Sequence, residues 1–361
     1  MTDEQELKAI REAIDGVDER IQELITQRAE LAERVAHIKL AADPEGSFYR
    51  PEREVDVLRK VKARNRGPLG GEDMARLFRE IMSACLALEQ PLNIAFLGPE
   101  GTFTQAAALK HFGHSVRTQP FGAIPDVFRE VEGGTCRYGV VPVENSTEGV
   151  VSHTLDMFLT SPLNICGEVT LRINHNLMSA AADLDAVRVV YSHSQSLAQC
   201  RGWLDRHLLR AERIPVGSNA EAARLVRDDP SAAAIAGETA AELYGLQILA
   251  RNIEDEPGNT TRFLVIGKQV VAPSGNDKTS LLFSTRNEAG GLHRLLTPLA
   301  EHGVSMTRIE SRPSRRGIWD YVFFVDIEGH QNDPQVARAL AELARAASMY
   351  KVLGSYPRAV L

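Results

Sequence analysis

One cation lies on a helix-like segment where the pattern calls for an apolar residue, and a second lies further along the same face. Apolar side chains recur in steps of three and four through residues 7–38, but one position of this seam is Arg28. An unpaired buried charge is costly, so we expect Arg28 to meet an anion or to extend to solvent. The anion is either a carboxylate of a partner helix or a ligand. Lys39 lies eleven residues later, roughly 16 Å along the same face, so both side chains can converge on one anionic ligand.

A third cation on the same segment is too distant to join them within one chain. Arg11 precedes Arg28 by seventeen residues, or about 25 Å of straight helix. We therefore expect Arg11 to contribute only from a second subunit packed antiparallel.

Small polar turns follow several strand-like runs further along the chain, at residues 98–104, 144–147 and 192–196. They offer hydroxyl, amide and carboxylate groups, and helix N-terminal amides favour anions. For each turn taken alone, helix capping is the better explanation of its Ser, Thr and Asn residues. The chain has no glycine fingerprint of a nucleotide site, no Gly-x-Ser-x-Gly elbow and no zinc spacing, so we expect neither a cofactor nor a metal.

Length and composition limit the class of protein. The 361 residues predict two or three domains, and 43% hydrophobic with 25% charged residues is ordinary for a globular protein. A net charge of -7 disfavours nucleic acid as a partner. No apolar run approaches the roughly 20 residues of a membrane span and the first residues are acidic, so we expect a cytoplasmic protein without membrane contact.

Three regions differ in their patterns. Residues 5–90 are helical in period with breaks at 43–46 and 67–71, which predicts three helices. Residues 93–267 alternate strand-like and helical runs, as in an α/β fold, and residues 279–347 predict a β-α-β-β-α-β unit. We accordingly expect domains at 1–92, 93–269 and 277–361.

The first region resembles the all-helical chorismate mutases in the spacing of its basic residues and in the run 50–54. The resemblance implies an intertwined homodimer that rearranges chorismate to prephenate. In it, Arg28 and Arg11 of a second subunit hold two carboxylates, Lys39 donates to the ether oxygen, Glu54 binds the hydroxyl and Arg53 supports the site. The implied substrate-binding residues are Arg11, Arg28, Lys39, Arg50, Arg53, Glu54, Cys85 and Glu89.

This chemistry needs placed cations and hydrogen-bond donors more than a nucleophile. The sequence departs from the usual pattern at three positions: Arg50 stands where an acidic residue can occur, Cys85 where serine is common, and Glu89 where glutamine is common. A carboxyl group donates a hydrogen bond only when protonated, so we expect Glu89, catalytic with Lys39, to favour acid conditions. The alternative is that Glu89 only pairs with a nearby arginine.

The second region resembles the prephenate dehydratases, which implies two α/β lobes of the periplasmic-binding-protein type with substrate between them. The motifs that carry this resemblance are 98–104, 142–146, 175–177, 192–195 and 259–263. Thr261 is implied as the catalytic donor to the departing hydroxide. Strand alternation predicts that Thr261 and Arg262 point to opposite faces, unless the strand is irregular. The implied substrate-binding residues are Thr102, Glu144, Asn145, Ser146, His193, Gln195, Thr261, Arg262 and Phe263.

The third region resembles the amino-acid-sensing ACT domains, through 290–293 at a helix start and 310–313 at a strand end. The resemblance implies paired modules that bind L-phenylalanine at their interface and inhibit the dehydratase. A dimerisation module without a ligand is the alternative. The implied effector-binding residues are Gly290, Gly291, Leu292, His293, Glu310 and Ser311.

Taken together, the regions predict a bifunctional enzyme that converts chorismate through prephenate to phenylpyruvate, on the route to phenylalanine, under feedback control. Two alternatives stay open: a dehydratase that prefers arogenate, and an amino-acid-binding regulator without catalysis, since a fold does not fix a function.

Overall fold

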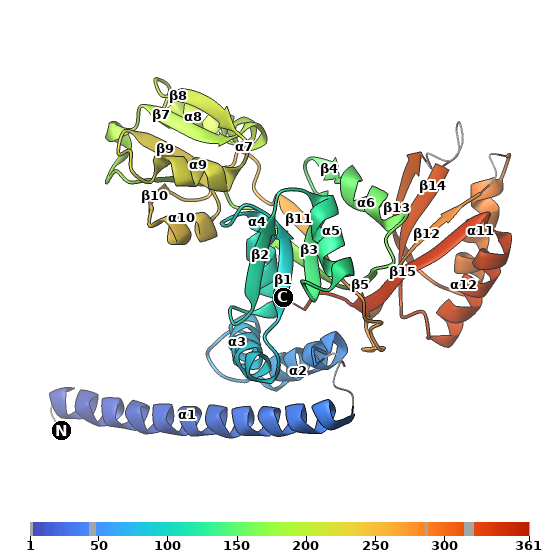
Figure 1. Cartoon of the computed structure of the whole chain (residues 1–361). Coiled ribbons are helices and arrows are strands. Elements are labelled where there is room, and N and C mark those ends of the chain that lie inside the picture. The colour runs from blue at the N-terminus through green and yellow to red at the C-terminus, as the bar shows by residue number, and fades with distance from the viewer. Residues whose placement is uncertain (1–2, 43–47, 286–287, 314–320, 361) are drawn as a thin grey trace.

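The computed structural model describes residues 3–42, 48–285, 288–313 and 321–360. Figure 1 shows a helical N-terminal part, two α/β lobes beside each other, and a C-terminal sheet covered by two helices. The break between the first two helices that we predicted at 43–46 lies outside the described residues. No helix in the described part of the chain is long and apolar enough to cross a membrane.

Three helices form the N-terminal part, as predicted: α1 (Asp3–Ala42), α2 (Pro51–Arg64) and α3 (Gly71–Glu89). Only the C-terminal part of α1 lies near α3, and the rest extends away from the molecule (Figure 1). Its apolar seam is consequently exposed, with Leu24 at 63% and Ile10 at 51%. A long exposed apolar face of this kind belongs in an interface.

The first α/β lobe has the sheet order β2-β1-β3-β11-β5, with β4 paired to β3. Strands β1, β2 and β3 are parallel, whereas β11 runs antiparallel to its neighbours β3 and β5. The strands are β1 (Asn93–Leu97), β2 (Arg117–Phe121), β3 (Tyr138–Asn145), β4 (Gly149–Val150), β5 (Asn164–Arg172) and β11 (Thr260–Gly267). The helices are α4 (Phe103–Phe112), α5 (Ile124–Gly133) and α6 (Ser152–Phe158).

The second lobe is inserted between β5 and β11, so the chain crosses between the lobes twice. Its sheet order is β10-β6-β9-β7-β8. The strands are β6 (Asn176–Ser179), β7 (Val189–His193), β8 (Glu212–Val216), β9 (Ala232–Ala236) and β10 (Gln247–Ala250). The helices are α7 (Ser194–Gln199), α8 (Arg201–His207), α9 (Asn219–Val226) and α10 (Glu238–Tyr244), with a short 3-10 turn at Leu184–Ala186.

The C-terminal part has the predicted β-α-β-β-α-β order, with the antiparallel sheet order β13-β14-β12-β15. Its elements are β12 (Asp277–Ser284), α11 (Gly291–Glu301), β13 (Met306–Pro313), β14 (Tyr321–Glu328), α12 (Pro334–Ala346) and β15 (Met349–Pro357). The two helices cover one face of this sheet (Figure 1). The other face shares a hydrophobic core with the first lobe, in which Phe324 and Leu353 join Phe158 and Ile165.

One glycine allows this close docking. Gly354 of β15 has φ +153, and a Cβ there would lie 2.2 Å from the backbone oxygen of Ile165 in β5. The C-terminal sheet therefore packs closely against the first lobe where β15 meets β5.

Candidate active sites

The N-terminal helices enclose a hollow of about 370 Å³ lined by α1, α2, α3 and the segment before α2. The structure brings most of the residues predicted for the mutase site to it, namely Arg28, Lys39, Arg50, Arg53, Glu54, Cys85 and Glu89. Arg11 lies elsewhere, towards the free end of α1. This placement agrees with the helix geometry, which allows Arg11 to reach such a hollow only from another subunit.

Two groups of the hollow have environments that bear on chemistry. Lys39 Nζ donates to the Phe48 carbonyl oxygen at 3.2 Å and lies 5.4 Å from the centre of the Phe48 ring, so its ammonium is held in place. The pKa of Glu89 is raised because burial disfavours its charged form, and the nearby Lys39 and Arg28 only partly oppose this. Glu89 is therefore more easily protonated than an ordinary glutamate.

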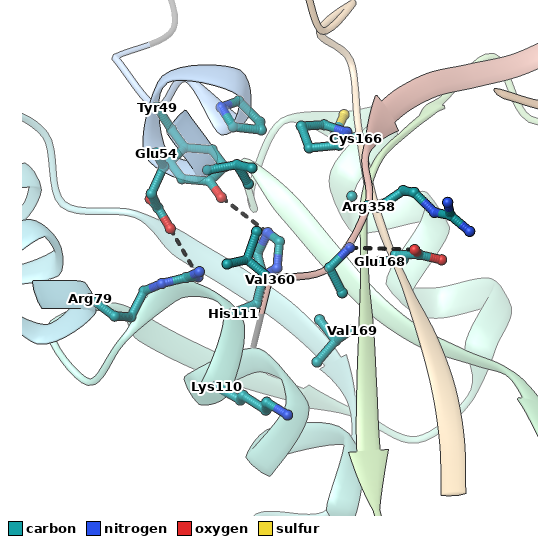
Figure 2. Close-up of a pocket in the computed structure, with 15 residues that line it drawn as sticks. Tyr49, Glu54, Arg79, Lys110, His111, Cys166, Glu168, Val169, Arg358 and Val360 are labelled. Atoms are coloured by element: carbon teal, nitrogen blue, oxygen red, sulfur yellow. Dashed lines mark hydrogen bonds and ion pairs between the residues drawn. The ribbon is translucent and has the colours of Figure 1, made fainter. Parts of the chain in front are cut away.

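Glu54 has a buried partner that the sequence reasoning missed. Arg79 of α3 is 6% exposed and its Nη1 lies 2.9 Å from Glu54 Oε1 (Figure 2). Burial raises the pKa of Glu54, and Arg79 opposes that shift. The sequence did contain a signal for Arg79. It is a cation that recurs at the spacing of the apolar positions Met82 and Cys85 on one face of α3, just as Arg28 interrupts the apolar seam of α1.

A second cavity, of about 590 Å³, lies between the two α/β lobes. Thr102, Asn145, His193, Gln195, Thr261 and Phe263 line it, all predicted for the dehydratase site. We call this cavity the cleft. Among the described residues that line it, none is lysine or arginine. The N-termini of α4 and α9 face it instead, through Thr102 and Ser218, and helix N-termini favour anions.

Thr261 belongs to a chain of polar side chains that crosses the cleft floor. Asn145 Nδ2 donates to Thr261 Oγ1 at 2.7 Å and to Asn259 Oδ1 at 2.8 Å. Asn259 Nδ2 donates to Gln199 Oε1 at 3.3 Å, and His175 Nε2 lies 2.8 Å from the same oxygen. We call these five residues the cleft chain. Asn145 donates to Thr261 Oγ1, so Thr261 is the acceptor in this contact and its hydroxyl keeps one hydrogen that can be donated.

The cleft chain also joins the two lobes, because Gln199 belongs to the second lobe and Asn145 and Thr261 belong to the first. Glu148, beside β4, accepts from Gln195 Nε2 and Gln199 Nε2 of α7, each at 3.3 Å. The pKa of His175 is lowered by burial, which keeps its ring neutral. Sequence reasoning missed Gln199, Asn259 and Glu148 as site residues, although Gln199 lies one helical turn after the predicted Gln195.

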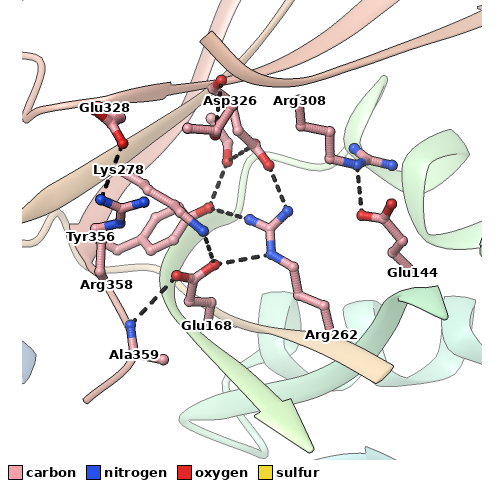
Figure 3. A network of polar contacts seen from close by, with 12 residues as sticks. Glu144, Glu168, Arg262, Lys278, Arg308, Asp326, Glu328, Tyr356, Arg358 and Ala359 are labelled. Atoms are coloured by element: carbon pink, nitrogen blue, oxygen red, sulfur yellow. Dashed lines mark hydrogen bonds and ion pairs between the residues drawn. The ribbon is translucent and has the colours of Figure 1, made fainter. Parts of the chain in front are cut away.

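Three residues predicted for the dehydratase site do not reach the cleft. Glu144 pairs with Arg308, and Arg262 pairs with Glu168 and Asp326 on the other face of the same strands (Figure 3). The physical reason is the alternation of side chains along β3 and β11, which turns Asn145 and Thr261 inward and their neighbours outward. Ser146 is exposed, and its Oγ accepts from the Thr260 amide. None of the three lines the cleft, and Ser146 meets the cleft chain only through its Oγ, which donates to Asn259 Oδ1 at 3.4 Å.

The predicted effector motifs are placed as expected in the C-terminal sheet and helices. Gly290 has φ +74 and directly precedes α11, and Glu310 and Ser311 lie on β13 near its end. Ser311 is exposed. Gly291 is buried at the start of α11, whereas His293 is exposed.

Comparisons with known proteins agree with this division of the chain. Family models match at residues 10–90 (chorismate mutase type II), 94–270 (prephenate dehydratase) and 279–345 (ACT domain). A curated relative from Stutzerimonas stutzeri, a bifunctional chorismate mutase/prephenate dehydratase, is 57% identical over 100% of both chains.

Two solved structures match the part after the helices. A prephenate dehydratase from Arthrobacter aurescens in complex with L-Phe is 35% identical, with a TM-score of 0.68 over 74% of this chain and 90% of that one. A protein described as a novel type of quorum quenching acylase is 32% identical, also with a TM-score of 0.68, over 74% and 98%. The same fold is thus found in proteins with two different described activities. The relative from Stutzerimonas stutzeri matches this chain over its full length, including the N-terminal helices, and therefore decides between these activities. The chain belongs to the family of bifunctional chorismate mutase/prephenate dehydratases that carry an ACT domain.

Proposed function

We propose that the hollow and the cleft are the two active sites, acting in turn on chorismate and prephenate. The cleft chain is the observation that carries this proposal, because its bond from Asn145 holds the Thr261 oxygen in place on the wall of the cleft. Loss of hydroxide from prephenate needs such a donor at the departing oxygen.

In the mutase site, Arg28 and Arg11 of a second subunit bind the two carboxylates of chorismate. Lys39 and protonated Glu89 donate to the ether oxygen as negative charge grows there. Glu54, held by Arg79, receives the substrate hydroxyl. Arg50, Arg53 and Cys85 complete the wall of the hollow. The exposed seam of α1 supports a homodimer, because a second α1 would cover it.

In the dehydratase site, the N-termini of α4 and α9 and neutral hydrogen-bond donors bind the prephenate dianion. His193 and Gln195 from the second lobe and Thr102 and Phe263 from the first enclose the ring. Prephenate is favoured over arogenate because Glu148 is the one carboxylate among the described lining residues, and two glutamine amides already occupy it. An ammonium group would find no free counter-charge there.

The C-terminal domain is the regulatory part. L-Phenylalanine binds between two copies through Gly290, Gly291, Leu292, His293, Glu310 and Ser311, and inhibits the dehydratase. The complex of the Arthrobacter aurescens dehydratase with L-Phe supports this assignment. The cytoplasmic location stays a prediction from sequence.

Two variants test the separation of the sites. With chorismate as substrate, Thr261→Ala is expected to accumulate prephenate, because its dehydratase rate falls about 100-fold or more while the mutase is unaffected. Lys39→Ala is expected to leave chorismate unused yet to dehydrate added prephenate at the normal rate. Loss of both activities in either properly folded variant would contradict two independent sites.

A further inference from the structure

The C-terminal domain contacts the two strands of the cleft chain from the face opposite the cleft. Thr261 pairs with Asn145 across β11 and β3, and the next pair along the ladder is Arg262 with Glu144. Because side chains alternate, one pair faces the cleft and the other faces the C-terminal sheet. The groups that hold the catalytic hydroxyl are thus each one residue away from a group held by the C-terminal domain.

All three side-chain nitrogens of Arg262 make polar contacts. Its Nε lies 2.9 Å from Glu168 Oε2, its Nη1 2.5 Å from Asp326 Oδ2, and its Nη2 donates to Tyr356 Oη at 3.0 Å (Figure 3). Asp326 and Tyr356 belong to β14 and β15, and Lys278 of β12 shares the Glu168 oxygen at 2.9 Å. The Arg262 side chain is only 15% exposed, so this network fixes its position.

Glu144 is held by the strand that carries the effector motif. Arg308 Nε donates to Glu144 Oε2 at 2.8 Å, and the Arg308 side chain is 13% exposed. Arg308 and Glu310 lie two apart on β13, so their side chains share a face of the strand. A displacement of β13 at Glu310 would therefore also displace Arg308, which is paired with Glu144.

The ladder between the two cleft strands is irregular directly after these pairs. The register shifts between Arg262 and Phe263, where β3 has one residue more than β11. Such a bulge separates the two end pairs from the regular ladder that follows. A displacement of about 1 Å at a catalytic group can cost about 100-fold in rate.

We propose that Glu144 and Arg262 are positioning residues, through which the C-terminal domain sets the placement of the Asn145–Thr261 hydrogen bond. The inference rests on the proposed function of the cleft and adds the route of its regulation. Amino-acid binding at the C-terminal domain shifts β13 and β14, the ion pairs carry this shift to β3 and β11, and the Thr261 hydroxyl moves from its working position.

A neighbouring ion pair supplies the matched control. Arg312, on the same strand as Arg308, bonds Ser152 Oγ at 2.6 Å and pairs with Asp156 Oδ1 at 3.1 Å. It also joins β13 to the first lobe, but neither Ser152 nor Asp156 lines the cleft. Removing it weakens the domain contact but leaves the Arg308–Glu144 and Arg262–Asp326 pairs in place, and because Arg312 also lies in the 310–313 motif, its ratio is compared at phenylalanine concentrations that calorimetry shows to be saturating.

The experiment compares Arg308→Gln, Glu144→Gln, the double variant and Arg312→Gln in the full chain. Dehydratase rates are measured on prephenate without and with saturating phenylalanine, phenylalanine binding by calorimetry, and the mutase rate as a check of folding. The ratio of uninhibited to inhibited rate should fall about fivefold or more in the first three variants while phenylalanine still binds. Arg312→Gln should keep the normal ratio.

Two further variants make the test specific. The charge-swapped pair Glu144→Arg with Arg308→Glu should regain much of the ratio, which a purely structural role would not predict. Tyr356→Phe, which removes one bond to Arg262 but leaves its charge paired with Asp326, should lower the ratio as well. An unchanged ratio in Arg308→Gln, or an equal loss in Arg312→Gln, would overturn the inference. Unmodified protein without dehydratase activity would instead contradict the proposed function.

Discussion

At the scale of single residues, the proposed dehydratase chemistry depends on the direction of the hydrogen bonds around Thr261. Asn145 Oδ1 accepts from the backbone amides of Thr147 and Glu148, at 2.9 and 3.0 Å. Its nitrogen must therefore point at Thr261, and the Thr261 oxygen acts as acceptor within the protein. On the proposed mechanism, the hydroxyl then donates its hydrogen to the leaving group.

Asn145→Asp tests this direction with almost no change in shape. Aspartate keeps both bonds from Thr147 and Glu148 but cannot donate to Thr261, and it adds a negative charge to a site for a dianion. Dehydratase kcat should fall about 100-fold, while mutase activity stays normal. A dehydratase rate within a factor of two of the original would show that Asn145 does not orient Thr261.

Glu89 predicts a pH dependence of the mutase. Since its pKa is raised, the protonated donor form persists to higher pH than in an ordinary glutamate and is lost as pH rises through that pKa. The mutase kcat/KM should therefore decline from acid towards alkaline pH, whereas Glu89→Gln should give a flat profile and equal or exceed the original enzyme above pH of about 7.

Glu80→Gln on the same helix is the control, because Glu80 is half-exposed and pairs with His114 away from the hollow. It should keep the pH slope. A flat profile of the original enzyme together with an inactive Glu89→Gln variant would refute the role of Glu89.

At the scale of elements, α1 has a face that the described chain does not cover. Its apolar positions, including Ile14 at 52% and Leu31 at 57% exposed, continue along its length. Arg11 lies on the free part of this helix, and Arg28 lines the hollow. A second α1 packed antiparallel would cover the seam and bring Arg11 to the neighbouring hollow.

Mixed dimers test this arrangement. Arg11→Ala and Arg28→Ala proteins should each lack mutase activity, but mixing them under conditions of subunit exchange should restore it, because one site of each mixed dimer has both arginines. Random exchange of a symmetric dimer predicts about a quarter of the normal activity. Continued inactivity of a mixture shown to have exchanged would place Arg11 outside the partner's site.

Periodicity predicted the three N-terminal helices and the order of elements in the C-terminal part, because local patterns determine them. Alternation correctly set Thr261 and Arg262 on opposite faces. It could not show that Arg262 meets Asp326, since that contact joins segments 64 residues apart. Gln199 and Asn259 were missed for the same reason, because their partners are distant in sequence and only the fold brings them together. Arg79 was missed although its place among the apolar positions of α3 marked it in the sequence.

At the scale of the whole molecule, the mutase helices are joined to both later domains. Arg59 of α2 donates to the carbonyl oxygens of Ser274 and Asn276, at 2.9 and 3.0 Å, and so grips the segment before the C-terminal sheet. Tyr49 and His111 meet at 3.0 Å between the mutase and the first lobe (Figure 2). The three domains therefore form one packed unit with separate sites.

His111 makes this junction sensitive to acid. Burial, reinforced by Arg79, lowers the pKa of His111 to about 3. The unfolded chain takes up a proton near its ordinary pKa, whereas the folded junction keeps the ring neutral, so stability present above that value is lost as pH falls. Urea unfolding from neutral pH to pH of about 4.5 should show up to about 1.4 kcal/mol lost per pH unit from this group.

His111→Gln should remove that contribution, because its amide does not titrate yet can still bond Tyr49. Equal acid slopes for the original chain and His111→Gln would contradict a neutral His111 at the junction.

The central claim is that one chain performs two consecutive reactions at two sites under control of its C-terminal domain. Its most direct test is to supply chorismate to the full chain and follow prephenate and phenylpyruvate separately, with and without phenylalanine. We predict that both products form in sequence, and that phenylalanine lowers phenylpyruvate formation so that prephenate accumulates. The claim would be contradicted if the chain did not consume chorismate, or if it formed no phenylpyruvate from added prephenate.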